Sequence, residues 1–588
     1  MRVLGINEGH NGSVAVLEDG VITFALQEER LNRIKEYVGF PEQALDFALN
    51  YLGLSPGDFD AVCLSNLSSP SPDRKREYHL RSYDENADSV VDHLRSGNLR
   101  SAQKRAWRQM PESVRAMGAK WRHSHGNADV EAILTSRGFS QSKIRRTLHH
   151  KNHAACAYYG MRQNAEDKHL VLTLDGAGDN ICSQVYVAEN GKMTLLAETP
   201  AGHSVGQIYS RMTHMMGMRP HEHEYKLMGM AAYADSKYSQ PVVEFLETLL
   251  DLDPDNPMKF KSLCGDTALI EPILEKGLKR VRFDSLCGGM QVFCENLMVK
   301  WVRACVRETG ISKVVAGGGV FMNVKANKLI SELEEIDFFD VFPSCGDETL
   351  AFGAAWLGAT DLDPSLSEKI VFNNLYLGPD ADYDLDEAMA EYGDRFEFIA
   401  DENMSERVAN LLAEGEIVAR ASGRMEFGAR ALGNRTIMAD PGRPDVIPTI
   451  NKMIKMRDFW MPFAPSMLRE WCDKYIVRPS TLPEETVSPW MMHTFDTTEL
   501  RSEMRGATHP YDGTARAQVV CKEINPGYHD ILTRFAEKKN KGVILNTSFN
   551  LHGFPIVMGA TDALYVADHS DIRYLLLPGY LAIKKNPK

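Results

Sequence analysis

The sequence of 588 residues has no long uninterrupted apolar run, and no stretch reaches the roughly 18 apolar residues that a membrane-spanning helix needs. It also has no charged-then-apolar leader, because Arg2–Asn7 is typical of a strand entering a turn. None of its ten cysteines lies in a Cys-x-x-Cys pair, a usage typical of buried free thiols in a reducing cytosol. We therefore expect a cytoplasmic protein that does not enter a membrane.

Positive charge is in deficit: the formal net charge is −14, which argues against general affinity for nucleic acids or anionic membranes. The length predicts two or three domains. Residues 68–146 are the exception, with basic stretches at 73–76, 104–108 and 143–146. We interpret them as a largely helical insertion. Its basic faces indicate either a surface for an anionic or bulky partner or, as we prefer, ordinary solvated helix faces.

A strand followed by a glycine-bearing turn and another strand occurs twice. Residues 2–7 lead into a turn with His10, Asn11, Gly12 and Ser13, and a hairpin follows over residues 14–27. Residues 170–174 lead into a second turn, with strands at 184–187 and 194–198 after it. The backbone N–H groups of such a turn can hold a phosphate oxygen, and this second turn contains Asp175, Gly176 and Gly178. The repetition predicts a duplicated α/β fold with a nucleotide between its halves.

His149 and His153 are four residues apart, so on a helix they project from the same face. Two imidazoles placed in this way can bind one metal ion. Small residues follow, from Ala154 to Ala157, and would let the helix lie close to a neighbour. The alternative is a pair of histidines that bind no ligand.

Three further features of the first half are candidate ligand contacts. Lys226 lies beside small residues on an expected helix, and the glycines before Asn323, which include Gly318 and Gly319, allow close approach of a nucleoside or form a tight turn. Asp347 lies where a loop enters a helix, so it is either a ligand or an N-cap.

After a linker over residues 364–379, the second half places arginines next to glycines, an arrangement that brings guanidinium groups onto phosphate or carboxylate oxygens. The alternative is a set of surface ion pairs. The candidate anion-binding residues here are Arg424, Arg430, Arg435, Lys455, Arg457, Arg516, Thr547, Ser548 and Asn550.

The ordered set of motifs resembles the O-carbamoyltransferases of antibiotic and nodulation-factor biosynthesis over nearly the whole chain. The motifs are Glu28–Arg33, His149–Ala155, Asp175–Asp179, Lys226–Met230, Gly317–Asn323, Gly346–Asp347, Phe427–Arg435, Asp512–Gln518 and Leu545–Asn550. Two positions depart from the family pattern: His10 is followed by Asn11 where the family more often has Asp, and Phe554 stands where a polar residue is usual.

The resemblance implies an actin/hexokinase-like (ASKHA) domain over residues 1–365 and a YrdC-like α/β domain over residues 366–588. In the first domain, His149, His153 and Asp347 would hold a metal ion, Fe²⁺ or alternatively Zn²⁺ or Mn²⁺. The turns at His10–Ser13 and Asp175–Asp179, together with Lys226 and the glycine segment, would hold a nucleotide. In the second domain, Lys455 and Arg457 with Thr547–Asn550 would bind an acyl-adenylate.

The implied reaction makes carbamoyl-adenylate from carbamoyl phosphate and ATP with Mg²⁺ in the second domain and passes the carbamoyl group to a small-molecule hydroxyl in the first. Lys455 and Arg516 would act in the first step, and His10 would be the base for the acceptor, or else a histidine that only caps its own turn. Two rival interpretations are a tRNA threonylcarbamoyl-type enzyme and a non-catalytic ATP-binding regulator. The acceptor and the oligomeric state, including a homodimer, stay open.

Overall fold

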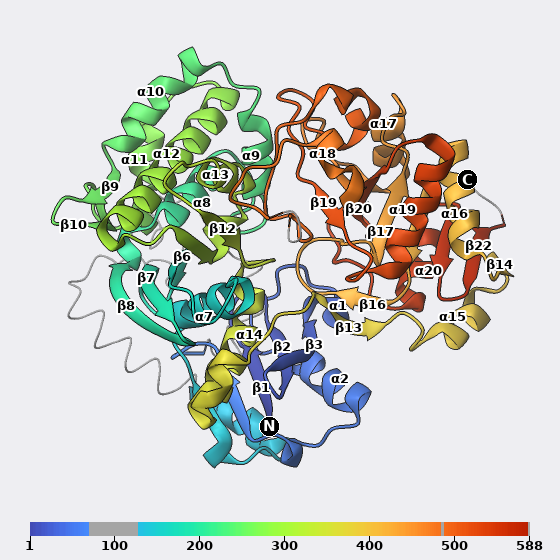
Figure 1. The fold of residues 1–588 in the computed structure, drawn as a ribbon, viewed down its shortest axis with the longest axis horizontal. Helices are drawn as coiled ribbons and strands as arrows, with labels where there is room; N and C mark the ends of the chain where they lie inside the picture. The colour runs from blue at the N-terminus through green and yellow to red at the C-terminus, as the bar shows by residue number, and fades with distance from the viewer. Residues whose placement is uncertain (70–126, 484–486, 586–588) are drawn as a thin grey trace, which may run out of the picture.

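The computed structural model describes residues 1–69, 127–483 and 487–585, which form three main β-sheets with helices on their faces (Figure 1). The first sheet has the order β3-β2-β1-β4-β5 and the second β12-β11-β6-β7-β8. The strands of the first are β1 Arg2–Asn7, β2 Ser13–Glu18, β3 Val21–Gln27, β4 Ala61–Leu64 and β5 Ile144–Arg146. Those of the second are β6 His169–Gly178, β7 Ile181–Glu189, β8 Lys192–Pro200, β11 Lys313–Gly317 and β12 Phe338–Val341. We call the two sheets with their helices the first and second lobes.

The two lobes repeat one arrangement. In each sheet the first strand in sequence pairs antiparallel with the second, and parallel with the fourth of the five. The glycine-bearing turns thus occupy equivalent places, after β1 and at the end of β6. This confirms the predicted duplicated α/β fold.

Helices α7 (His149–Met161) and α14 (Leu350–Leu362) pack against each other between the lobes, α14 on β1 and β4 and α7 on β6 and β11. Small residues make this close approach possible. A Cβ at Gly353 would lie 2.3 Å from the carbonyl oxygen of Asn152, and one at Gly317 would lie 2.9 Å from that of His153. The predicted proximity of the histidine helix to its neighbour is confirmed.

The other helices of the lobes surround these sheets. They are α1 Glu29–Asn32, α2 Glu42–Leu52, α8 Val205–Met215, α9 Glu224–Ala231, α10 Ser236–Glu247, α11 Glu271–Gly277, α12 Phe283–Thr309 and α13 Val324–Ser331, with the β9–β10 ribbon (Leu250–Asp253, Asn256–Ser262) beside α12. Within the described residues, no helix is both long and apolar enough to cross a membrane.

The C-terminal part is built on an eight-stranded mixed sheet in the order β14-β22-β21-β15-β17-β20-β18-β19. Its strands are β14 Phe396–Ala400, β15 Val418–Ala421, β17 Arg435–Ala439, β18 Ala464–Leu468, β19 Gln518–Val520, β20 Val543–Ser548, β21 Tyr574–Leu577 and β22 Tyr580–Lys584. Its helices are α15 Leu385–Tyr392, α16 Met404–Glu414, α17 Val446–Ile450, α18 Cys472–Tyr475, α19 Pro526–Lys539 and α20 Ala560–Asp568. A ribbon of β13 (Tyr376–Asp380) and β16 (Arg424–Glu426) lies next to β3 of the first lobe. Separate apolar clusters include α16 with α19 and α15 with α20, giving the layered α/β architecture expected.

The predicted insertion is described only in part. Residues 70–126 lie outside the described residues, and 127–136 are helical. The prediction that the basic stretch 143–146 belongs to the insertion is wrong. Residues Ile144–Arg146 form β5, which pairs parallel with β4 as part of the first sheet.

Candidate metal centre and cation-lined site

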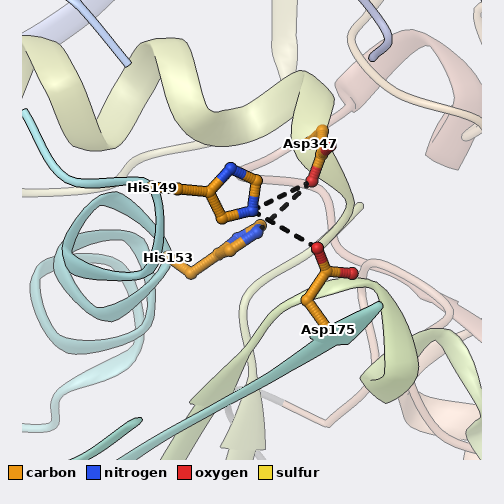
Figure 2. Close-up of side chains that lie close together, drawn as sticks. All are labelled: His149, His153, Asp175 and Asp347. Carbon is orange, nitrogen blue, oxygen red and sulfur yellow. Dashed lines mark hydrogen bonds and ion pairs between the residues drawn. The ribbon is translucent and has the colours of Figure 1, made fainter. Parts of the chain in front are cut away.

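Four side chains converge where the two lobes meet (Figure 2). His149 Nε2 lies 3.3 Å from Asp175 Oδ2 and 3.5 Å from Asp347 Oδ1, and His153 Nε2 lies 3.5 Å from the same Asp347 oxygen. Within the described part of the chain, this is the one group of three or more potential ligands whose atoms all lie within 4.8 Å of one another. Helix α7 supplies both imidazoles because its first turn puts residues four apart on one face.

Asn66 fixes the orientation of the first imidazole. Its Nδ2 donates to Ser65 Oγ at 2.9 Å, so its Oδ1 faces His149 Nδ1 at 3.0 Å and accepts from it. In the neutral ring, Nε2 then carries the lone pair and points at the two carboxylates. Burial would lower the pKa of His149, but Asp347 and Asp175 outweigh it and raise this pKa to about 9, so the site favours a positive charge.

The residues fit a divalent metal. Among the residues that the structure describes, neither ring nitrogen of buried His153 has a hydrogen-bond partner, an arrangement that a buried imidazole rarely keeps without a ligand. Asp347 begins a short 3₁₀ turn without capping it by its side chain, so the N-cap alternative is wrong. Two imidazoles with two carboxylates are a donor set that Fe²⁺, Zn²⁺ and Mn²⁺ accept.

The predicted glycine turns serve this cluster. A Cβ at Gly178 would lie 2.1 Å from the His149 ring, so only glycine leaves room for the imidazole. The backbone N–H of Gly319 donates to Asp175 Oδ1 at 3.2 Å, and a Cβ there would lie 2.7 Å from that oxygen. Gly318 has a φ of 101°, a conformation that favours glycine. The second phosphate turn of the prediction therefore contributes Asp175 to the candidate metal cluster.

The first turn is attached to the same cluster by Asn7. Its Nδ2 donates to the carbonyl oxygens of His10 at 2.7 Å, Asn11 at 3.3 Å and Asp347 at 2.8 Å. The predicted phosphate donors are otherwise engaged, because Gly12 N donates to Tyr37 O at 3.2 Å and Ser13 Oγ to a backbone carbonyl at 2.7 Å. We therefore do not retain these two donors as phosphate ligands.

His10 lies at the rim of the first turn, where its Nε2 is 3.6 Å from Glu36 Oε2 and its ring centroid is 5.5 Å from that of His221. Burial, with the negative charges of Glu29 and Glu348 nearby, raises the pKa of Glu36 to about 8. The structure therefore pairs the candidate base with a carboxyl group that titrates near neutral pH.

In the C-terminal part, the structure brings together the Lys-x-Arg and Thr-Ser-x-Asn elements. Lys455 Nζ donates to Ser548 Oγ at 3.0 Å and to Asn550 Oδ1 at 2.7 Å, and Arg457 donates to Thr547 Oγ1 at 3.1 Å. Residues about ninety positions apart thus meet where the π-helical turn after α17 ends at Lys455 and where β20 ends at Ser548.

Arg430 and Arg516 complete a set of cations that, together with Lys455 and Arg457, we call the cation cluster; Lys455 is buried and the three arginines are half-buried. Removal from solvent lowers the pKa of each of the four, that of Arg457 to about 10, and neighbouring cations lower it further for Lys455, Arg457 and Arg516. The Nε of Arg516 is buried without a hydrogen-bond partner. Such a cluster is costly without an anion, so it indicates a site for a highly charged anionic ligand.

The cation cluster adjoins the candidate metal centre. Ala429 N donates to Ser344 Oγ at 3.2 Å, and Arg30 donates to Gly428 O at 2.7 Å, so the loop that carries Arg430 contacts both the first lobe and the segment between β12 and Asp347. Arg430 is close enough to Glu348, the neighbour of Asp347, for each charge to act on the other.

Four predicted ligands lie elsewhere or have other partners. Arg424 donates to the carbonyls of Gly378, Leu377 and Thr23, and fully buried Arg435 to those of Met558, Gly423 and Asn434. We do not retain either as a phosphate clamp, because both guanidinium groups donate to three or more backbone carbonyl oxygens.

The other two contact protein side chains. Lys226 pairs with Asp458, and Asn323 exchanges hydrogen bonds with Gln291. Asn7 and Asn66 were not among the predicted site residues, although Asn7 ends β1 and Asn66 lies two residues after its parallel neighbour β4, where ligand-binding residues often lie.

Comparison with known proteins identifies the family of the chain. The family profile described as carbamoyltransferase N-terminus matches residues 2–356, and that described as carbamoyltransferase C-terminus matches residues 409–584. Nodulation protein NolNO of Sinorhizobium fredii is 27% identical over 98% of this chain and 79% of its own. The 3'-hydroxymethylcephem-O-carbamoyltransferase of Streptomyces clavuligerus is 24% identical over 98% of both chains. Uncharacterized protein MJ1058 of Methanocaldococcus jannaschii is 30% identical over 74% of this chain and 73% of its own. The chain therefore belongs to the carbamoyltransferase family, and the protein is an enzyme of the transferase class.

Proposed function

We propose that the protein is an ATP-dependent O-carbamoyltransferase that makes carbamoyl-adenylate in its C-terminal part, residues 366–588, and transfers the carbamoyl group to a hydroxyl of a small-molecule acceptor in residues 1–365. The observation that carries this proposal is the cation cluster beside the candidate metal centre. Four clustered cations, one buried and three half-buried, favour the binding of an anion, and the neighbouring histidines and carboxylates form a donor set that fits a metal.

The first step brings anions together. Carbamoyl phosphate would lose its phosphate to water, and an oxygen of the remaining carbamate would attack the α-phosphorus of ATP, so that pyrophosphate leaves and carbamoyl-adenylate forms. Mutual repulsion opposes this encounter unless fixed positive charges offset it. Lys455, Arg457 and Arg516 provide such charges, in positions held by Thr547, Ser548 and Asn550.

The second step needs a site that excludes water, because an acyl-adenylate hydrolyses readily. Arg430 adjoins both clusters and can hold the adenylate phosphate as the intermediate moves between them. A divalent metal bound by His149, His153, Asp175 and Asp347 would polarise a phosphate or carbonyl oxygen.

The acceptor hydroxyl must lose a proton as it attacks. His10 is the proposed base, and its Nε2 lies 3.6 Å from Glu36 Oε2 at the rim of the first turn. The proton passes to His10, the carbamoyl carbon–oxygen bond to AMP breaks, and the products are a carbamate ester and AMP.

The test uses the full-length protein loaded with Fe²⁺ and incubated with ATP, carbamoyl phosphate, Mg²⁺ and a library of hydroxyl compounds. We expect AMP release that depends on carbamoyl phosphate, with one compound class converted to carbamates as seen by mass spectrometry. Carbamate formation without ATP, or no AMP release with any compound, would contradict the proposal.

A further inference from the structure

A short segment that follows Lys455 of the cation cluster contacts helix α9 of the second lobe. Met456–Pro462, which we call the docking loop, follows directly on Lys455 and contains Arg457. Asp458 Oδ2 lies 3.1 Å from Lys226 Nζ on helix α9, and Trp460 Nε1 donates to the carbonyl oxygen of Lys226 at 3.2 Å. Figure 1 shows α9 on the side of its lobe that faces the C-terminal part.

The packing below this ion pair is tight. A Cβ at Gly229, one turn along α9, would lie 2.9 Å from Met461 Sδ, and His509 Nε2 lies 2.8 Å from the carbonyl oxygen of Gly229. The backbone of α9 therefore lies directly against the loop and the segment near Arg516, with no room for a side chain between them.

Arg457 links these contacts to the cation cluster. One of its terminal nitrogens donates to Pro462 O at 3.2 Å, which closes the docking loop, while the other donates to Thr547 Oγ1 at 3.1 Å. Met461 N also donates to Asp458 O at 3.0 Å. A displacement at Asp458 is thus transmitted to Arg457 and to the adjacent Lys455 through a few short bonds.

Charge explains why an acid is needed at this place. Asp458 is the one acidic residue between Lys455 and Pro462, a segment with two cations of the cluster. Its carboxylate is about one-third exposed and Lys226 is mostly buried, so the pair stabilises the fold only weakly. Its effect is geometric, because a catalytic group displaced by about 1 Å can lose about a hundredfold in rate.

We propose that Asp458 is a positioning residue whose ion pair with Lys226 holds the docking loop on α9 and thereby places Lys455 and Arg457 for carbamoyl-adenylate formation. This inference rests on the proposed function. It adds that the N-terminal half takes part in the step assigned to the C-terminal half. In that step Lys226 acts by its ion pair with Asp458 and not by binding a nucleotide. Neither residue makes or breaks a bond with the substrates in this step.

The test measures pyrophosphate release from carbamoyl phosphate, ATP and Mg²⁺ by the full-length protein without acceptor. We expect Asp458→Asn and Lys226→Met each to lower kcat/KM about tenfold, and the double variant to lose about tenfold as well, because both changes break one interaction. Asp458→Glu should keep most of the activity. The matched control is Asp167→Asn, which breaks the 2.8 Å ion pair between Lys313 and Asp167 within the second lobe. The Asp167 carboxylate is about as exposed as that of Asp458, and its replacement should leave the rate unchanged.

Two results would overturn the inference alone: Asp458→Asn behaving like Asp167→Asn, or the double variant losing about a hundredfold, the product of independent effects. Wild-type protein that releases no pyrophosphate would overturn the proposed function and this inference with it. The two failures are therefore distinguishable in one assay.

Discussion

Asn66 gives the sharpest prediction about the metal centre, because it touches His149 and none of the other proposed ligands. Replacing it by alanine removes the acceptor for His149 Nδ1, which lies 3.0 Å from Asn66 Oδ1. The imidazole then loses the bond that keeps Nε2 unprotonated and aimed at Asp175 and Asp347. The buried Nδ1–H is left without a partner, at a cost of about 1–3 kcal/mol.

This cost sets the expected size of the effect. Loss of a bond that orients a metal-binding histidine typically lowers metal affinity by about 10–100-fold, or roughly 1.4–2.7 kcal/mol, in agreement with the penalty for the unpaired N–H. Asn66→Asp should keep or raise the affinity, because a carboxylate accepts the same hydrogen bond more strongly.

The assay titrates metal-free protein with Fe²⁺ without oxygen, and with Zn²⁺ against a chelating indicator. Asn164→Ala is the control, since its exposed amide bonds only to Asp167, at 3.2 Å, outside the site. The reasoning would be refuted if Asn66→Ala bound metal as tightly as the wild type while His153→Ala did not.

Three further predictions concern neighbouring groups. Gly178→Ala should abolish metal binding, because its Cβ would lie 2.1 Å from the His149 ring, whereas Gly176→Ala, whose Cβ has 3.5 Å to the nearest atom, should bind metal normally; equal affinities in a titration would disprove the steric argument. Burial and Arg457 lower the pKa of Lys455 well below the usual lysine range, and anions bind the protonated form of this side chain. The KM for carbamoyl phosphate should therefore rise about tenfold per pH unit above that lowered pKa, and the rise should vanish in Lys455→Arg. A KM that does not depend on pH would count against this prediction. The pKa of Glu36 is raised to about 8, so the contribution of Glu36 to stability falls as pH rises from its unfolded pKa through about 8. In urea unfolding, the stability of Glu36→Gln relative to the wild type should therefore increase between pH 5 and pH 9. A difference in stability that stays constant over this range would contradict the prediction.

Much of the fold was predictable because it depends on local patterns. The repeated pattern of a strand followed by a glycine-bearing turn predicted two equivalent lobes, and the spacing of His149 and His153 predicted that both lie on one face of a helix. The proximity of Lys455 to Ser548 and Asn550 followed from the family resemblance, since nothing local connects segments so far apart.

The errors came from long-range contacts. Arg424 and Arg435 lie beside glycines, as phosphate-binding arginines do, but their partners are backbone carbonyls from distant segments that the local sequence does not show. Asp175 was predicted to contact a phosphate, yet its side chain lies among the candidate metal ligands His149, His153 and Asp347. Asn66 acts only because β4 and α7 come together in the fold.

The division of labour between the two sites is the central claim, and rapid quenching with mass spectrometry tests it most directly. His149→Ala and Lys455→Met are each mixed with ATP, carbamoyl phosphate, Mg²⁺ and the acceptor found by screening. We predict that His149→Ala accumulates carbamoyl-adenylate without carbamate ester, and that Lys455→Met forms neither. Carbamate ester made by His149→Ala, or carbamoyl-adenylate made at the wild-type rate by Lys455→Met, would contradict the account.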